Sequence, residues 1–188
     1  MKELSLNILD ITENSVKAGA TLVEIFLEES DKTLKVAISD NGSGMTEEVR
    51  RSVIDPFYTT RTTRRVGLGI PLFKAAAEQT GGRLEIESRH VDLHPEDHGT
   101  TVTATFYKDH IDFTPLGDVK STITTLIQGH ADIDFHYRHT YGDRTVELDT
   151  RQIRAVLDGI PLDSYEILLW IGGNIEEQYD GLIKQNKK

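Results

Sequence analysis

Three residues near the start of the chain are of types that can handle a phosphate and a divalent cation. Asp10 and Asn14 stand four residues apart and Lys17 follows within a turn, so on a helix they share one face. A carboxylate can orient water, an amide oxygen suits a hard cation, and an ammonium group suits phosphate. Seen alone, the three residues favour a solvated polar stripe.

Two glycine pairs add to this set. The stretch DNGSGM, residues 40–45, places Gly42 and Gly44 directly after an apolar-alternating segment, a pattern that alone favours a hairpin turn. The stretch VGLGIPLFK places Gly67 and Gly69 just before a helix. Bare N–H groups at the positive end of a helix form an anion site, although a flexible hinge fits that pair equally well.

The elements that must position these residues follow from periodicity. Apolar residues at helical spacing predict helices, and alternating ones predict strands. The pattern predicts a helix over 3–18, strands over 21–30 and 32–40, a helix over 46–54 with Val49, Val53 and Ile54 facing inward, a loop over 55–69, a helix over 70–82, and strands over 83–89 and 100–108. This order predicts an α+β fold, a two-layer α/β sandwich with a mixed sheet and helices on one face.

Residues 109–188 read as a separate block, which divides the chain into 1–108 and 109–188. We expect a helix over 119–130, a hairpin turning at YGD with Ile133, Phe135 and Tyr137 facing in, a helix over 149–159, and a last helix over 163–184. Asp149 or Thr150 is the expected N-cap of the third of these elements. The block carries no recognisable catalytic motif and reads as a small α+β domain for interaction or regulation.

Composition restricts the class of protein. The chain has 188 residues, no cysteine and a net charge of −10, so disulfides and cysteine-ligated metals are excluded. The acidity argues against nucleic acid or an anionic membrane as a partner. The N-terminus lacks an apolar leader region and no apolar run of 18 residues occurs, which predicts a cytoplasmic protein.

Five stretches in order resemble the GHKL superfamily, the ATP-binding Bergerat fold shared by gyrase, heat-shock chaperones, histidine kinases and mismatch-repair ATPases. ENSVKAGAT resembles the N box, especially that of the mismatch-repair branch, and DNGSGM resembles the first glycine box. DPFYTTR is similar to the phenylalanine-centred box of histidine kinases, VGLGIPLFKAAAEQTGGRLEIES to their second glycine box, and GTTVTATF to the last box. The resemblance covers residues 1–108.

The resemblance implies a site for ATP and Mg²⁺. Asp40 would accept the adenine amino group, with Thr100 in the same hydrogen-bond network. Gly42 and Gly44 would let the base lie against the backbone, and Met45 would form an apolar wall. The residues implied on the phosphate side are Asn14 as the Mg²⁺ ligand, Lys17 as a phosphate contact, Gly67, Leu68 and Gly69 around the phosphates, Phe57 at the lid edge, and Arg61, Arg64 and Arg65 in the lid, one of which would reach the γ-phosphate.

Two departures from the family pattern concern the chemistry. Asp10 stands where hydrolysing members carry a Glu as general base, and its carboxylate is set back by one carbon–carbon bond, about 1.5 Å. Arg65 stands where the kinase pattern has a further Gly, which makes the lid more cationic. We therefore expect ATP to bind, and we expect any hydrolysis to be slow.

The histidines offer little further chemistry. His90, His94 and His98 are regularly spaced, but Pro95 and Asp97 make their segment a loop, so a solvated loop is preferred to a metal site. His136 and His139 are expected at the surface. We expect no segment before residue 1 that would supply the helical phosphoacceptor hairpin of a histidine kinase.

Three functions remain open. The leading one is a Mg-ATP-binding protein that regulates a protein partner through its nucleotide state, ATP or ADP. The second is a stand-alone serine protein kinase of the anti-sigma-factor type. The third is a nucleotide sensor that does not hydrolyse ATP. A mismatch-repair role is disfavoured because the chain is short and acidic.

Overall fold

The structure is a computed structural model that describes residues 3–54 and 68–184. Its elements are α1 (Leu4–Lys17), β1 (Leu22–Glu29), β2 (Thr33–Asp40), α2 (Glu47–Ile54), α3 (Gly69–Gln79), β3 (Arg83–Arg89), β4 (Gly99–Tyr107), α4 (Val119–Gly129), β5 (Asp134–Tyr141), β6 (Arg144–Asp149), α5 (Thr150–Leu157) and α6 (Tyr165–Lys184). Helices and strands occur in the order that periodicity predicts. Asp149 is the N-cap of α5, and its side chain accepts from the N–H of Arg151.

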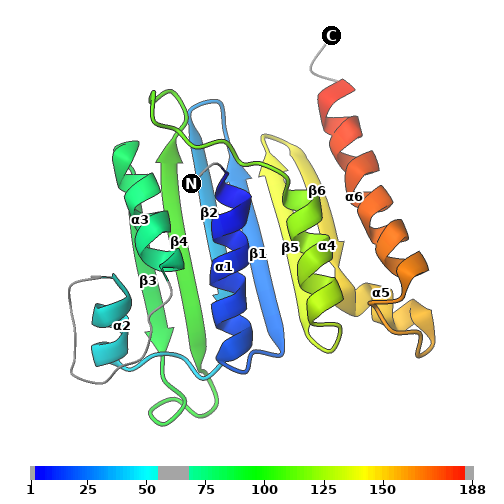
Figure 1. Ribbon diagram of the computed structural model, residues 1–188, viewed down its shortest axis with the longest axis horizontal. Helices are drawn as coiled ribbons and strands as arrows, with labels where there is room; N and C mark the ends of the chain where they lie inside the picture. The colour runs from blue at the N-terminus through cyan, green and yellow to red at the C-terminus, as the bar shows by residue number, and fades with distance from the viewer. Residues whose placement is uncertain (1–2, 55–67, 185–188) are drawn as a thin grey trace.

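The strands form one mixed six-stranded sheet in the order β3-β4-β2-β1-β5-β6. Neighbouring strands are antiparallel except β1 and β5, which run parallel. Helices α1, α3 and α4 lie side by side across one face of the sheet (Figure 1). The predicted two-layer α+β architecture is therefore confirmed.

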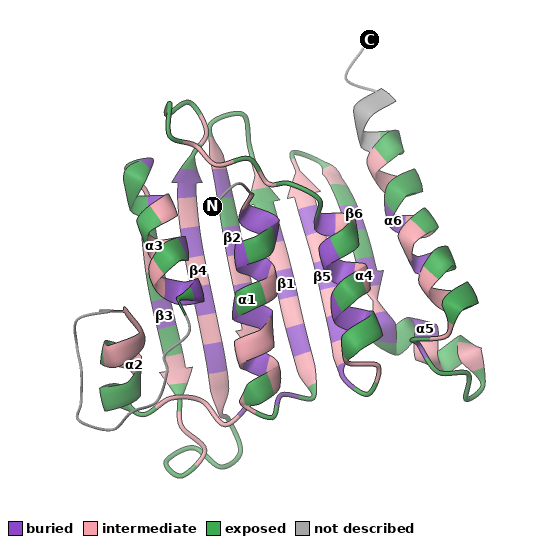
Figure 2. Cartoon of the chain, in the orientation of Figure 1, coloured by how far each residue is buried: buried purple, intermediate pink, exposed green. Residues whose placement is uncertain are grey.

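Alternation along the strands explains why only one face needs a cover. In β1 and β2 every second side chain is buried, and those between are more exposed (Figure 2). Because successive strand residues point to opposite faces, the buried set forms one apolar layer under the helices. The buried residues of β1 and β2 are Val23, Ile25, Leu27, Leu34, Val36 and Ile38, and those of α1 include Leu4, Ile8 and Ile11.

The sheet continues beyond residue 108. β5 pairs with β1 along its whole length, from Leu22 opposite Asp134 to Glu29 opposite Tyr141. A parallel pair needs a crossover connection, and α4 lies in the segment that leads into β5. Residues on both sides of position 108 therefore share one sheet and one apolar core. The division into units 1–108 and 109–188 stays a prediction.

One residue of α2 that the sequence predicted to face inward lies on the surface. Val49 is 43% exposed, while Val53 and Ile54 are half-buried. The reason is the place of α2, which lies beside α3 at the edge of the molecule rather than on the sheet (Figure 1). Among the described residues, α2 packs against the apolar core through Val53 and Ile54 in its last turn.

The surface position predicted for His139 is wrong. His139 follows Phe135 and Tyr137 at every second residue, so it faces the core with them and is 4% exposed. Its Nε2 lies 2.8 Å from Glu29 Oε2 and its Nδ1 lies 2.8 Å from Tyr179 Oη. Alternation within the strand carried this signal, because the period that buries Tyr137 also buries His139.

His136 also departs from the predicted surface position. It lies on the opposite face of the sheet, where its side chain is only 14% exposed. Its ring nitrogens lie 3.3 Å from a Glu24 oxygen and 2.7 Å from a Glu147 oxygen. Cross-strand neighbours cover it there.

The described residues contain no group of three or more His, Cys, Asp or Glu side chains placed to hold a metal ion. Among them, too, none of the helices combines the length and the apolar composition needed to cross a membrane.

Candidate functional site

The predicted site residues come from one end of the sheet. β2 ends at Asp40 and β4 begins at Gly99, and the two strands are antiparallel neighbours. Their register sets Asp40 directly opposite Thr100. α1 runs over the sheet toward this end, and α3 lies beside α1 (Figure 1). Residues 60 positions apart are thus brought together by strand pairing.

Asp40 is fixed through both carboxylate oxygens. Ser15 on α1 donates from Oγ to Oδ2 of Asp40 at 2.7 Å, and the N–H of Gly42 donates to Oδ1 at 2.9 Å. Ser15 is 4% exposed and Asp40 is half-buried. A carboxylate oxygen has two acceptor directions, so each oxygen can still accept from a ligand. The position suits recognition of an N–H donor such as an exocyclic amine.

The glycines of DNGSGM have a reason within the chain itself. A Cβ on Gly42 would lie 2.9 Å from Cβ and O of Ala18. Gly44 has φ +67, and a Cβ there would lie 1.9 Å from the carbonyl oxygen of Arg89. Close packing of this turn on α1 and β3 therefore excludes side chains at both positions. That a base also lies against this backbone stays a prediction.

Hydroxyl groups connect the glycine turn to the neighbouring strands. The N–H of Met45 donates to Ser88 Oγ at 2.7 Å, and Ser88 Oγ lies 2.8 Å from Thr100 Oγ1. Ser88 thus joins Thr100 and Met45, both predicted for the adenine side, into one network. No sequence pattern singled out Ser88, because its role depends on the pairing of β3 with β4.

The loop between β3 and β4 closes over the same turn. The N–H of Val91 donates to the carbonyl of Ser43 at 2.9 Å. His98 Nδ1 lies 2.5 Å from the carbonyl oxygen of Gly42, so that nitrogen carries the proton and donates. His98 therefore fixes the turn, a role that the sequence did not indicate.

The phosphate-side residues lie on α1 and at the start of α3. A Cβ added to Gly69 would lie 3.0 Å from Cβ of Asp10, so the first residue of α3 packs directly on that side chain. Leu68 holds the N-cap position without a side-chain hydrogen bond and is 66% exposed. The first N–H groups of α3 therefore receive no cap from that side chain, as at anion-binding helix ends.

Asn14 and Lys17 lie one and two turns along α1 from Asp10. Asn14 is half-buried, whereas Asp10 and Lys17 are exposed. The predicted residues Phe57, Arg61, Arg64, Arg65 and Gly67 lie outside the described residues. The donor set on this side is a carboxylate, an amide oxygen and a helix N-terminus, which are the types that Mg²⁺ and phosphates require. A Mg-nucleotide fits the residue types present.

Comparison with known proteins identifies the family. The protein-family model described as "Histidine kinase-, DNA gyrase B-, and HSP90-like ATPase" matches residues 2–110 of the chain. That match spans more than half of the chain. The chain therefore belongs to this family, the GHKL superfamily that the motifs resemble.

Curated relatives match through this region. A probable C4-dicarboxylate sensor kinase of Halalkalibacterium halodurans is 34% identical over 82 residues, which are 44% of this chain and 15% of that protein. Sporulation kinase A of Bacillus subtilis is 31% identical over 108 residues, which are 57% of this chain and 16% of that protein. The chain thus matches less than a fifth of the length of either kinase.

Two solved structures share the fold. The N-terminal domain of a DNA repair protein aligns with a TM-score of 0.53 at 16% identity, covering 79% of this chain and 53% of that one. The ATPase domain of Aquifex aeolicus MutL, solved with ADP, aligns with a TM-score of 0.50 at 15% identity, covering 79% and 63%. At these identities the likeness concerns the fold alone. It covers a larger share of the chain than the family model does.

Proposed function

We propose that this chain binds Mg-ATP at the end of the sheet formed by β2 and β4 and regulates a protein partner through its nucleotide state. The observation that carries the proposal is the carboxylate of Asp40, held by Ser15 and the N–H of Gly42 and set opposite Thr100. A fixed, half-buried acceptor beside a hydroxyl suits the amino group of adenine.

The phosphates belong at the start of α3, next to Asp10 and Asn14. Mg²⁺ would neutralise phosphate charge there, with the side-chain oxygen of Asn14 as a ligand. Lys17 would add a cation, and the N–H groups after Leu68 would donate to phosphate oxygens. Asp10 would orient the attacking water with a shorter reach than a Glu has, so hydrolysis is slow.

The regulatory part of the proposal rests on residues 109–188. They extend the sheet beyond the family model, which ends at residue 110. A nucleotide that binds two conformations of the chain unequally would shift their populations, and a partner bound to residues 109–188 would respond to that shift.

Calorimetry with Mg-ATP tests the binding site. We expect micromolar-range binding of Mg-ATP or Mg-ADP and a rise in melting temperature that grows with nucleotide concentration. The Asp40→Asn variant should lose most of both effects, while Asp132→Asn, an exposed position elsewhere, should keep them. Absence of nucleotide binding by the parent chain would refute the proposal.

Phosphoryl transfer to a protein serine is the second candidate. The names of two curated relatives, a sensor kinase and a sporulation kinase, support phosphoryl transfer, and serine is the acceptor that we propose. Incubation with γ-labelled ATP and candidate partners separates the two. Label on a protein supports the kinase, and label released as free phosphate supports slow hydrolysis.

A further inference from the structure

The last helix of the chain presents an apolar surface that nothing in the described residues covers. Among the residues that the structure describes, twelve large hydrophobic side chains are exposed, and five of them fall within 15 residues of sequence. We call this set the α5–α6 surface, and it consists of Val156, Ile160, Tyr165, Leu169 and Trp170. Tyr165 is 75% exposed, and Leu169 and Trp170 are more than half exposed. Such a concentration marks an interaction site more often than chance exposure does.

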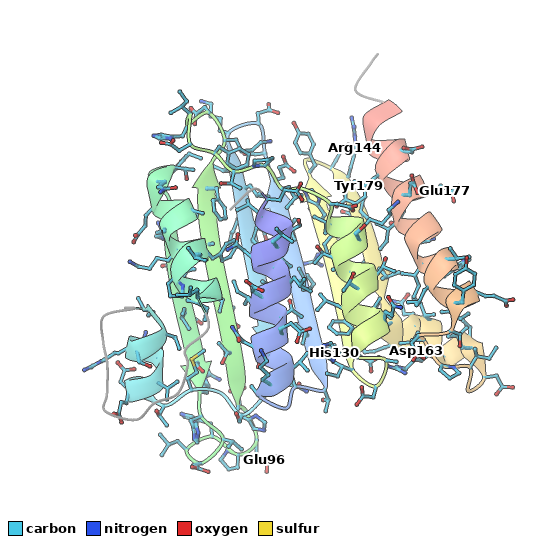
Figure 3. The ribbon with its side chains drawn as sticks, viewed as in Figure 1. Glu96, His130, Arg144, Asp163, Glu177 and Tyr179 are labelled. Carbon is cyan, nitrogen blue, oxygen red and sulfur yellow. The ribbon has the colours of Figure 1, made fainter. Side chains whose placement is uncertain are left out.

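The inner side of α6 is firmly held, so the outer side is not exposed through poor docking. Ile171 and Ile175 are fully buried. Tyr179 Oη lies 2.8 Å from His139 Nδ1 and also hydrogen-bonds to Tyr137 Oη. Figure 3 shows Tyr179 directed toward the sheet and Glu177 directed away from it.

The outer side of α6 stands between two grooves. A groove of about 420 Å³ separates it from α4, and Leu169, Gly172 and Gly173 lie along it. A second groove of about 210 Å³ lies between α6, α5 and β6, lined by Trp170 and Val156. The exposed residues of α6 thus form a ridge with a hollow on each side.

Gly172 and Gly173, an adjacent pair within α6, have no packing reason among the described residues. Glycine is a poor helix former, so an interior Gly pair weakens the helix. A Cβ on Gly173 would meet no atom within 4 Å, and one on Gly172 only Thr124 Oγ1 at 3.9 Å. Alanine would therefore fit at both positions. No described residue makes the close approach that glycine permits, so it is available to another molecule.

The charges around the surface select the kind of partner. The charged side chains described on α6 and on the link before it are all acidic: Asp158, Asp163, Glu166, Glu176, Glu177 and Asp180. Lys120, the basic residue of the neighbouring groove, is already paired with Glu176 at 3.0 Å. An apolar surface rimmed by carboxylates complements an apolar face flanked by Lys and Arg. It opposes a second copy of itself and an anionic lipid surface.

Hydrogen bonds from α6 to the outer edge of β6 argue against strand addition at this end of the molecule. Gln178 on α6 donates from Nε2 to the carbonyl of Glu147 at 3.0 Å, and its Oε1 accepts from the N–H of Glu147 at 2.9 Å. This side chain takes the place of a neighbouring strand at that residue. A groove between two helices instead suits a third helix.

We infer that the α5–α6 surface docks a basic amphipathic helix of a protein partner, its apolar face on Leu169 and Trp170 and its Lys or Arg side chains against the acidic rim. This rests on the proposed function, because it names the surface through which nucleotide state would reach a partner. It is tested separately from nucleotide binding.

Trp170 is the only tryptophan of the chain and reports directly on the surface. The probe is a synthetic peptide of about 18 residues, about 27 Å long as a helix, with a Leu face flanked by Lys. Added to the full chain, it should shift the Trp170 emission to shorter wavelength and saturate. A peptide with the same Leu face and Glu flanks, and a scrambled Lys peptide without an apolar face, should bind roughly tenfold more weakly or not at all.

Two matched variants make the test specific. Gly173→Leu fills part of the groove between α6 and α4 without meeting any described group, so the helix keeps its fold and peptide affinity falls roughly tenfold or more. Glu166→Lys should weaken binding several-fold, whereas Glu87→Lys, which changes net charge equally at an exposed position on β3, should not. Melting temperature shifts with Mg-ATP check that each variant is folded and has kept its nucleotide site.

Four outcomes would overturn the inference. The first is unchanged Trp170 emission when the Lys peptide is added. The second is an affinity for the Glu peptide equal to that for the Lys peptide, or an affinity of the Gly173→Leu variant for the Lys peptide equal to that of the parent. The third is self-association that Gly173→Leu abolishes, which would make the surface a contact between copies. The fourth is an emission shift caused by anionic vesicles. Normal Mg-ATP binding in any of these cases would leave the nucleotide proposal intact, and peptide binding without Mg-ATP binding would refute only that proposal.

Discussion

Ser15 Oγ donates a 2.7 Å hydrogen bond to Asp40 Oδ2 and so ties the last turn of α1 to the end of β2. The bond joins the helix that carries Asp10 and Asn14 to the carboxylate assigned to adenine. A nucleotide that contacts both groups would therefore bind to two elements, α1 and β2, whose relative position is fixed.

Ser15→Ala should weaken Mg-ATP binding while leaving the fold intact. A hydrogen bond to a charged group is worth about 1.5–3 kcal/mol, which corresponds to roughly 10- to 100-fold in affinity if the carboxylate loses its position. Calorimetry measures the affinity, and denaturant unfolding shows whether the variant is folded. Thr122→Ala, a buried hydroxyl on α4, is the matched control and should bind Mg-ATP normally.

Asp40→Asn should remove most nucleotide binding. Its amide would either present an NH₂ group to the adenine amino donor or accept without the assistance of charge. The melting temperature measured with and without Mg-ATP gives the result. Equal stabilisation of parent and Asn variant by nucleotide would show that Asp40 does not recognise the base.

The sequence predicted the sheet because its strands carry a clear period of two. β1, β2 and β4 each bury every second residue, as an apolar-alternating strand must when only one face is covered. The parallel pairing of β5 with β1 was beyond such reasoning. It joins segments more than 100 residues apart, and local pattern carries no information on register at that distance.

The candidate site also contains residues that the sequence predicted and residues that it did not. Residue types and spacing pointed to Asp10 and Asn14, and the resemblance to the first glycine box pointed to Asp40. Ser88 and His98 act through contacts that exist only after β3 and β4 pair and their loop folds over Gly42. Sequence motifs identify residues that would contact a ligand more readily than they identify the residues that hold such side chains in position.

Gly44→Ala should destabilise the protein far more than Gly142→Ala. Both glycines have positive φ, +67 and +60, so the backbone strain of an L residue, about 1–2 kcal/mol, is common to the two. A Cβ on Gly142 meets nothing within 4 Å, whereas one on Gly44 would lie 1.9 Å from the carbonyl oxygen of Arg89. Urea unfolding should give about 1–2 kcal/mol for Gly142→Ala and more than about 4 kcal/mol for Gly44→Ala. Similar losses would mean that contact with β3 is not the reason for glycine at position 44.

Glu29 should make the protein sensitive to acid. Burial raises the pKa of this carboxyl, but hydrogen bonds from His139 and Lys108 outweigh it, so the net pKa lies below the usual value of 4.5. The unfolded chain then takes up a proton at higher pH than the folded one. The stabilisation is present above about pH 4.5 and is lost as pH falls through the lowered pKa of the folded state.

Unfolding of Glu29→Gln across pH 3 to 7 checks this. The variant should be less stable than the parent near neutral pH, and its stability should fall less steeply in acid because the amide does not titrate. Glu28→Gln, the exposed neighbour, should follow the parent curve. Parallel acid curves for parent and Glu29→Gln would contradict the role assigned to Glu29.

The last prediction concerns the division of labour between Asp10 and Asn14. Intrinsic ATP turnover should be slow, on the order of one per minute or less, far below the typical enzyme rate of about 10 per second. Asp10→Glu extends the carboxylate by about 1.5 Å and should raise hydrolysis if the position of water limits the rate. Asn14→Ala should instead abolish the Mg²⁺ dependence of triphosphate binding, because the cation loses an oxygen ligand. Phosphate release measures the first effect, and calorimetry with and without Mg²⁺ measures the second. Rapid turnover by the parent would contradict the role proposed for Asp10, and unchanged Mg²⁺ dependence in Asn14→Ala would contradict the role proposed for Asn14.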